Sequence, residues 1–346
     1  MIAAPMGPWS RRGWLQWCRN VSLAATIAPV LPVLIVTFPF FALVLCGYLA
    51  TRAGALPVGA IGGLNGFVLY FALPCMLYRF GAGTPIAQLL DANVALVYLL
   101  CAALMVAGTV ALTRRGAMGW NDAAFGALVA AFPNTGFMGL PLLIALMGQA
   151  SAGTVIVVLT VDLVITSSAC IALSRLEGAG AHGVAVALRN AARGMAVNPM
   201  PWSIALGGVA SALQWQLPGP VDKTVAMLAD AASPVALFTI GAVLARSQLN
   251  QHESVPPGQY VPIALAKLMV HPLLVWSVGR AAIGLGADLS DFALTVMVLL
   301  AALPSASNVA LLVERFGAHG GRVARIILVS TVLAFFTFSA AVALLT

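Results

Sequence analysis

The 346-residue chain is too apolar to be a soluble domain: hydrophobic residues make up 61% of it, charged residues 8%, and its mean hydropathy is +1.01. Soluble domains carry about 25% charged residues. The net charge of +7 comes from arginines at the ends of apolar runs, without the interleaved aromatic residues of a nucleic-acid surface. We therefore expect a polytopic membrane protein that binds no nucleic acid.

Residues 1–28 form a weakly patterned prefix before the first long apolar run. Its SRRGWL stretch is similar to a twin-arginine export signal, but no soluble passenger follows it. We favour an interfacial segment anchored by Trp9, Trp14 and Trp17, or a start codon placed too early.

Apolar runs of about 20 residues, the length that crosses about 30 Å of hydrocarbon, predict ten membrane-spanning helices and an all-α fold. In chain order they are 29–50, 59–78, 92–113, 121–147, 153–174, 199–216, 224–245, 259–283, 290–313 and 323–345. The longest polar interval, 176–198, is expected to be a cytoplasmic linker. Within it, 184–195 is typical of a short amphipathic helix at the membrane interface.

The fourth and ninth predicted spans each contain a proline, small residues and an amide inside the apolar run. The stretches are AAFPNTGFMGLP from Ala130 and AALPSASN from Ala301. Proline removes a backbone donor and clashes with the preceding turn, which costs about 3 kcal/mol in a helix interior. In hydrocarbon such a break persists only where protein or a wet cavity covers it. Paired broken helices therefore indicate a transporter's binding site near the middle of the membrane.

Pro133 and Pro304 lie 171 residues apart, close to half the chain length. We interpret this offset as an internal repeat, with 29–175 as the first half and 199–346 as the second. Five spans per half give the halves opposite orientations. Loops after odd-numbered spans hold ten of the 17 lysines and arginines. This bias predicts cytoplasmic odd loops and two extracytoplasmic termini, in a multi-pass protein of the inner (cytoplasmic) membrane.

A crossing of the two breaks is the predicted substrate site. Half-helix N-termini carry roughly +0.5 of a charge each and unpaired N–H groups, which suit a carboxylate. The candidate substrate-binding residues at the breaks are Pro133, Asn134, Thr135, Gly136, Pro304, Ser305, Ser307 and Asn308. Either asparagine could also cap a freed backbone carbonyl, and the two roles are compatible.

Ionisable residues inside membrane spans are costly and mark function. Asp162 falls within the fifth predicted span, and Lys267 and His271 lie four residues apart in the eighth, before Pro272, where we expect a helix interruption. We expect Lys267 to be the counter-charge of an anionic substrate, and His271 or Asp162 to carry a coupled proton. The alternatives are an Asp162–Lys267 ion pair that only joins two helices, and a neutral His271 bonded to a carbonyl.

Several stretches resemble the auxin efflux carrier family. FPNTGFMGLPLL and LPSASNVALLVERFG are the most specific, joined by SPVALFTIGAVLA, KLMVHPLL and the Asn65, Tyr70 and Pro74 pattern. The resemblance implies two inverted five-span repeats with crossed broken helices 4 and 9. It also implies a scaffold of spans 1, 2, 6 and 7 and an elevator-like core of spans 3–5 and 8–10. On that scaffold Asn65, Tyr70 and Pro74 would have a packing role, with the alternative that the scaffold wall lines the pocket in one state. Members carry small organic anions, and the short interval after the fifth span favours a bacterial malonate or malate type over a plant auxin carrier.

The predicted function is secondary transport of a small organic anion such as malonate, malate or an auxin-like carboxylate. The expected partners are that anion, protons or Na⁺, membrane lipid and a second copy in a homodimer. No cofactor, metal or catalytic residue is predicted, and the five cysteines lack CxxC spacing. A sodium-coupled anion symporter of the bile acid carrier type is the alternative within transport. Three other classes are disfavoured. An intramembrane enzyme would need paired catalytic groups, and a channel would need a polar stripe repeated along its spans. An ATP-driven pump would need a GxxxxGK[ST] loop, and the sequence shows none of these features.

Overall fold

The computed structural model describes residues 30–115, 118–176, 199–249 and 255–345. Within these ranges the chain is helical, and the extended pairing found there is one isolated antiparallel bridge between Pro133 and Ser305. The all-α fold class is confirmed for this part of the chain. The predicted prefix 1–28 and the predicted amphipathic helix 184–195 lie outside the described residues.

Seven helical segments of the described chain are long and apolar enough to cross a membrane. They are Ile35–Arg52, Ala60–Ala82, Ile86–Arg115, Gln149–Ser174, Gly219–Arg246, Val261–Gly284 and Gly320–Leu345. These segments correspond to seven of the ten predicted spans. The fourth, sixth and ninth spans correspond to shorter helices: α8 (Trp120–Ala131), α9 (Leu140–Met147), α13 (Pro199–Ala212), α17 (Asp291–Ala302) and α18 (Val309–Phe316). The full count of ten therefore stays a prediction.

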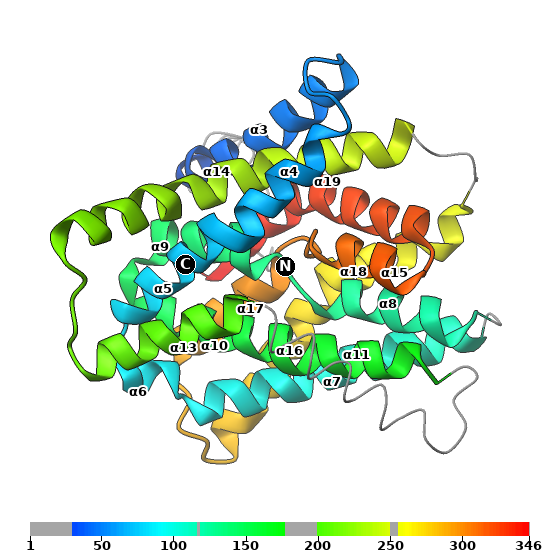
Figure 1. Ribbon diagram of the computed structural model, residues 1–346. Helices are drawn as coiled ribbons and strands as arrows, with labels where there is room; N and C mark the ends of the chain where they lie inside the picture. Colours follow the sequence, from blue (N-terminus) through cyan, green and yellow to red (C-terminus); the bar gives the residue numbers. More distant parts are fainter. Residues whose placement is uncertain (1–29, 116–117, 177–198, 250–254, 346) are drawn as a thin grey trace, which may run out of the picture.

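One group of helices contains α14 (Gly219–Leu249), which lies in the upper part of Figure 1. This first group consists of α14, α3 (Val30–Arg52), α4 (Ala60–Phe67), α5 (Leu73–Ala82) and α13. Glycines let α3 and α14 touch, because a Cβ on Gly47 or Gly241 would overlap the main chain of the other helix. Such close approach over small residues is how membrane helices gain packing energy without a hydrophobic driving force.

A second group surrounds α8 and α17, with α7, α8 and α11 in the lower part of Figure 1. Its other members are α7 (Ala92–Arg115), α10 (Ala152–Thr160), α11 (Ser167–Ser174), α15 (Val261–Leu265), α16 (His271–Gly284) and α18. Helix α19 (Gly320–Leu345) packs against both groups, since it contacts α3 as well as α17. Short turns connect these helices: α6 (Ile86–Leu89), η3 (Gln149–Ser151) and η5 (Pro257–Gln259).

Three prolines accompany widened helical turns. The π-helical segments η1 (Val68–Ala72), η2 (Thr135–Gly139) and η6 (Ala266–Val270) each end two residues before a proline, namely Pro74, Pro141 and Pro272. Proline has no N–H for the carbonyl four residues earlier, so a wider turn accommodates the missing bond. The predicted interruption at Pro272 was therefore wrong: the helix continues from α15 through η6 into α16.

Candidate functional site

The two breaks meet inside the protein. The Asn134 N–H donates to the Pro304 carbonyl at 2.8 Å, and the Ala306 N–H donates to the Phe132 carbonyl at 2.9 Å. Each broken chain thus supplies backbone partners that the other lost when its helix ended. Residues 123–140 and 296–306 are buried throughout. This burial meets the requirement that backbone freed at membrane depth be covered and hydrogen-bonded by protein.

Gly139 of the first break faces leucine side chains of the second break at short range. A Cβ on Gly139 would lie 2.9 Å from side-chain carbons of both Leu300 and Leu303. A Cβ on Gly136 would lie 3.6 Å from the nearest Leu159 carbon, which is an ordinary contact. Of the small residues predicted to let the two chains cross, Thr135, Gly136 and Gly139, it is Gly139 where an added side chain would force leucines of the second break to move.

Two further contacts hold the second break. The Ser305 N–H donates to Ser330 Oγ of α19 at 3.2 Å, and Lys267 Nζ donates to the Ala301 carbonyl at 2.6 Å. The Lys267 side chain is completely buried. Its ammonium lies at the C-terminal end of α17, where unpaired carbonyls concentrate negative partial charge. Lys267 therefore stabilises the end of the broken helix, whatever part it takes in substrate binding.

Three of the predicted substrate-binding residues at the breaks have buried polar atoms without a hydrogen-bond partner in the described chain. They are Thr135 Oγ1, Ser305 Oγ and Asn308 Oδ1. Leaving such a group unpaired costs about 1–3 kcal/mol. Buried polar groups are otherwise almost always satisfied, so a cluster of exceptions at the meeting point of two broken helices indicates a functional site.

A small cavity lies between the second break and the first helix group. Its volume is about 20 Å³. Polar lining residues are Asn65, Ser307 and Asn308, and the apolar lining comes from η1, η2, α14 and the start of α18. No hydrogen bond within the described chain uses the backbone N–H groups of Ser307 and Asn308. Since these two residues directly precede α18, the cavity wall includes the positive end of a half-helix.

Asn65 lines the cavity, which agrees with the alternative left open in the sequence analysis and not with the favoured packing role. The prediction used its position on the implied scaffold, which does not say which way an amide faces. An amide inside an apolar helix is nevertheless a signal, because it needs a partner when it leaves water. Its place beside Ser307 and Asn308 makes it a further candidate for ligand contact.

A buried polar cluster adjoins the second break. Asp162 accepts hydrogen bonds from the Tyr98 hydroxyl at 2.8 Å and from Thr166 Oγ1 at 3.2 Å. Lys267 Nζ lies 3.1 Å from His271 Nδ1. An ammonium can only donate, so Nδ1 is the acceptor, while Nε2 is buried without a partner among the described residues. Lys267 thus connects the cluster to the end of α17.

The structure shows which contacts these ionisable residues make, and their roles in binding and coupling stay predictions. In the described chain no ion pair joins Asp162 to Lys267, and His271 contacts Lys267 instead of a carbonyl. Tyr98 and Thr166 were missed by the sequence prediction. The signal for both was Asp162 itself, because a carboxylate buried in a membrane protein requires donors from neighbouring helices.

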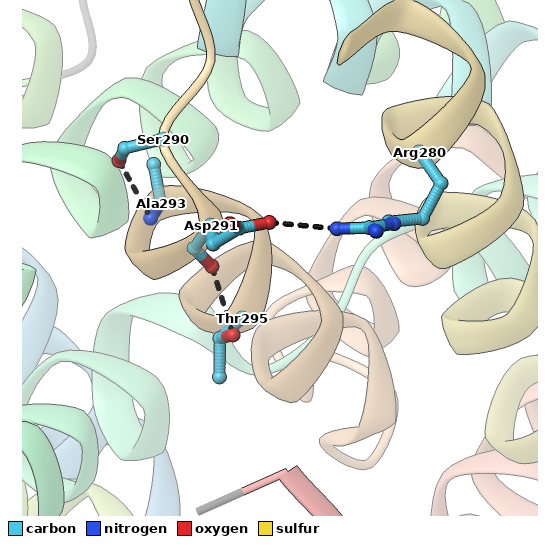
Figure 2. A network of polar contacts seen from close by, with 5 residues as sticks. All are labelled: Arg280, Ser290, Asp291, Ala293 and Thr295. Carbon is cyan, nitrogen blue, oxygen red and sulfur yellow. Dashed lines mark hydrogen bonds and ion pairs between the residues drawn. The ribbon is translucent and has the colours of Figure 1, made fainter. Parts of the chain in front are cut away.

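Asp291 makes polar contacts at the protein surface, in contrast to the buried contacts of Asp162. Asp291 accepts from Arg280 Nη1 at 2.7 Å, and Ser290 caps the start of α17 by accepting from the Ala293 N–H (Figure 2). The two charged side chains are 53% and 82% exposed. Exposed ion pairs contribute about 0–1 kcal/mol, so this network sets where α17 begins and adds little stability.

Several membrane-length helices and two broken apolar helices that meet at buried polar groups define a polytopic transporter. The described residues contain no cluster of three or more side chains of the metal-binding kinds His, Cys, Asp and Glu. A family model described as "Membrane transport protein" matches residues 32–342. The chain therefore belongs to this family, which is the auxin efflux carrier family that its motifs resemble.

Similar proteins cover nearly the same length. The chain is 30% identical over 300 residues to the "Putative malonate transporter" of Rhizobium meliloti (strain 1021), a match that spans 85% of this chain and 90% of that protein. It is 25% identical over 293 residues to the "Uncharacterized transporter YfdV" of Escherichia coli (strain K12), spanning 81% and 87%. The predicted family and the predicted class of membrane transporter are thus confirmed.

Proposed function

We propose that the protein is an elevator-type secondary transporter of a small organic anion across the cytoplasmic membrane. Malonate, malate or an auxin-like carboxylate is the substrate class, and the name of the Rhizobium meliloti relative supports malonate. The observation that carries the proposal is the meeting of the two breaks around the unpartnered polar atoms of Thr135, Ser305 and Asn308.

A carboxylate would be recognised at the start of α18. The Ser307 and Asn308 N–H groups can donate to its oxygens, and the half-helix adds roughly +0.5 of a charge. No lysine or arginine lines the cavity. We therefore assign the anion preference to backbone donors and amides. Lys267 contributes its positive charge at the end of α17, where it contacts the Ala301 carbonyl.

The element bounds support two inverted repeats of five spans. Helix α8 (Trp120–Ala131) and helix α17 (Asp291–Ala302) have equal length, and both of their ends differ by 171 positions. The segments Gln149–Ser174 and Gly320–Leu345 differ by the same 171 positions at both ends. This is the offset of the two prolines, so helices of corresponding rank in the two halves share a common plan.

The size of the cavity supports an elevator motion. A volume of about 20 Å³ is room for about one water molecule, far less than a dicarboxylate needs. The cavity lies between the first helix group and the second break, and Ser233 Oγ of α14 donates to the Phe137 carbonyl across this boundary at 3.2 Å. Sliding of the second group past the first would break that bond and widen the cavity.

Proton coupling is favoured over the sodium-coupled alternative. Half-helix C-terminal ends and unwound carbonyls are where transporters coordinate Na⁺, and here the Lys267 ammonium already contacts the Ala301 carbonyl. Asp162 and His271 are the coupling candidates that adjoin it. The enzyme alternative gains no support, because Asp162 bonds Tyr98 and Thr166 instead of a catalytic partner.

Uptake of labelled malonate into proteoliposomes tests this function. We expect uptake to follow an imposed pH gradient, to stop when a protonophore collapses it, and to be independent of Na⁺. Asp162→Asn should lose gradient-driven uptake and keep malonate exchange, whereas the exposed Asp230→Asn control on α14 should resemble wild type.

Two results would contradict parts of this proposal. Uptake that requires a Na⁺ gradient would favour the symporter alternative. Absence of both uptake and thermal stabilisation with every short carboxylate, with and without Na⁺ and at two pH values, would rule out the organic-anion assignment.

A further inference from the structure

A long apolar groove runs along the second helix group and shares no lining residue with the small cavity at the breaks. Its volume is about 520 Å³, and α7, the start of α8 and the η4 (Val161–Thr166) to α11 segment line it. Small side chains form the floor, among them Ala103, Ala107 and Ala169. Ala103 and Ala107 are exposed, so the groove opens to the outside of the protein.

The chemistry of the groove suits a hydrocarbon chain. On α7 the lining extends from Leu99 to Arg114, which is about 22 Å of helix at a rise of 1.5 Å per residue. The hydroxyl of Thr166, a lining residue, already donates to Asp162. The body of the groove therefore offers little hydrogen bonding to a polar ligand and a long apolar surface to an acyl chain.

One end of the groove is positively charged. Arg114 and Arg115 are exposed at the end of α7, and the Arg114 guanidinium carbon lies 4.8 Å from the ring centre of Trp120. Tryptophan and arginine are the residues that anchor proteins at the membrane–water boundary. Basic residues next to a cleft between membrane helices are complementary to anionic lipid headgroups.

We propose that this groove binds an anionic phospholipid, with one acyl chain between α7 and α11 and the headgroup at Arg114 and Arg115. The apolar lining selects the chain, and the two arginines select the negative headgroup. This site does not depend on the identity of the transported anion, because the two pockets use different residues.

Lipid retention by the purified full-length protein tests the proposal. The measurement is native mass spectrometry with phosphatidylglycerol or phosphatidylcholine of identical acyl chains. Wild type should retain phosphatidylglycerol preferentially. The double variant Arg114→Gln, Arg115→Gln should weaken phosphatidylglycerol retention about 25-fold, since each arginine near an anionic headgroup contributes roughly a factor of five. Arg52→Gln, an exposed arginine at the end of α3, is the matched control and should have no effect.

A second pair of substitutions tests the groove itself. Ala103→Leu with Ala107→Phe fills an exposed surface, so the fold should persist, and retention of both lipids should fall. The proposal is overturned if the double arginine variant keeps the wild-type preference. It is equally overturned if the filled groove retains phosphatidylglycerol as wild type does, because the acyl chain would then lie elsewhere.

Discussion

The two breaks have similar sequences, AAFP and AALP, but different surroundings. The first is buried throughout and is tied to the second by backbone hydrogen bonds. The second break ends at Ser307 and Asn308, which are half-buried, line the cavity and leave their N–H groups unused in the described chain. The comparison supports a hypothesis: the first break chiefly supports the crossing, and the second chiefly offers N–H groups to the proposed anion.

Gly139→Val should have the largest effect, because it separates the breaks. Its branched side chain would overlap Leu300 and Leu303, and overpacking of this kind costs about 1–3 kcal/mol. We expect loss of uptake together with a lower midpoint of thermal unfolding in detergent. Gly108→Val is the matched control, since Gly108 is exposed on α7 and an added Cβ there meets nothing within 4 Å. Wild-type uptake by Gly139→Val would show that the two breaks need not meet closely.

Asn308→Ala and Asn134→Ala compare the two breaks directly. A hydrogen bond to a charged group contributes about 1.5–3 kcal/mol, so Asn308→Ala should raise the Kd for malonate roughly 10- to 150-fold. Asn134→Ala should have a smaller effect on Kd, because the Asn134 contacts at the crossing use its backbone. Isothermal titration measures both, with Asn93→Ala on α7 as control. A larger loss for Asn134→Ala would reverse the roles assigned to the breaks.

Lys267→Ala tests how the end of α17 is supported. The substitution leaves the buried Ala301 carbonyl without its side-chain donor, which costs about 1–3 kcal/mol of stability. Lys267→Arg keeps a charged donor and should lose less stability and less anion affinity. Thermal unfolding and malonate titration measure the two effects, and the exposed Lys223→Ala is the control. Wild-type affinity in both Lys267 variants would limit this residue to packing.

Arg280→Gln should have the smallest effect. It removes the exposed ion pair with Asp291 shown in Figure 2, which contributes at most about 0.5–1 kcal/mol. Uptake should be unchanged, because α17 keeps its Ser290 cap and its contacts with the first break. A large loss of uptake would mean that the start of α17, far from the break, also controls transport.

Much of the fold follows from local sequence. Apolar run length predicted the seven membrane-length helices, and proline among small residues predicted where two more are broken. The predictions failed where the local signal was ambiguous. Pro272 and Pro133 both lie within long apolar runs, so the sequence does not distinguish them. The chain breaks at Pro133, whereas the helix around Pro272 continues with one π-helical turn, η6. The sixth predicted span, 199–216, coincides with the described helix α13 over Pro199–Ala212, so this span stays a prediction.

The candidate site was predictable in part. Residues of both breaks were identified by type, since proline and amides are conspicuous in an apolar run. Asn65 was identified, but its contact with the cavity could not be predicted, because the sequence does not say which way an amide faces. Tyr98 and Thr166 were not identified, because their importance comes from the carboxylate that they face.

The sequence by itself determined the membrane character, the long helices and the positions of the two breaks, because hydropathy and the missing proline N–H act within a few residues. Only the tertiary structure decided which groups satisfy one another. Asn134 meets Pro304, 170 positions away, and Lys267 meets Ala301, 34 positions away. A freed backbone group in a membrane protein accepts any donor that packing brings near, and packing is a property of the whole fold.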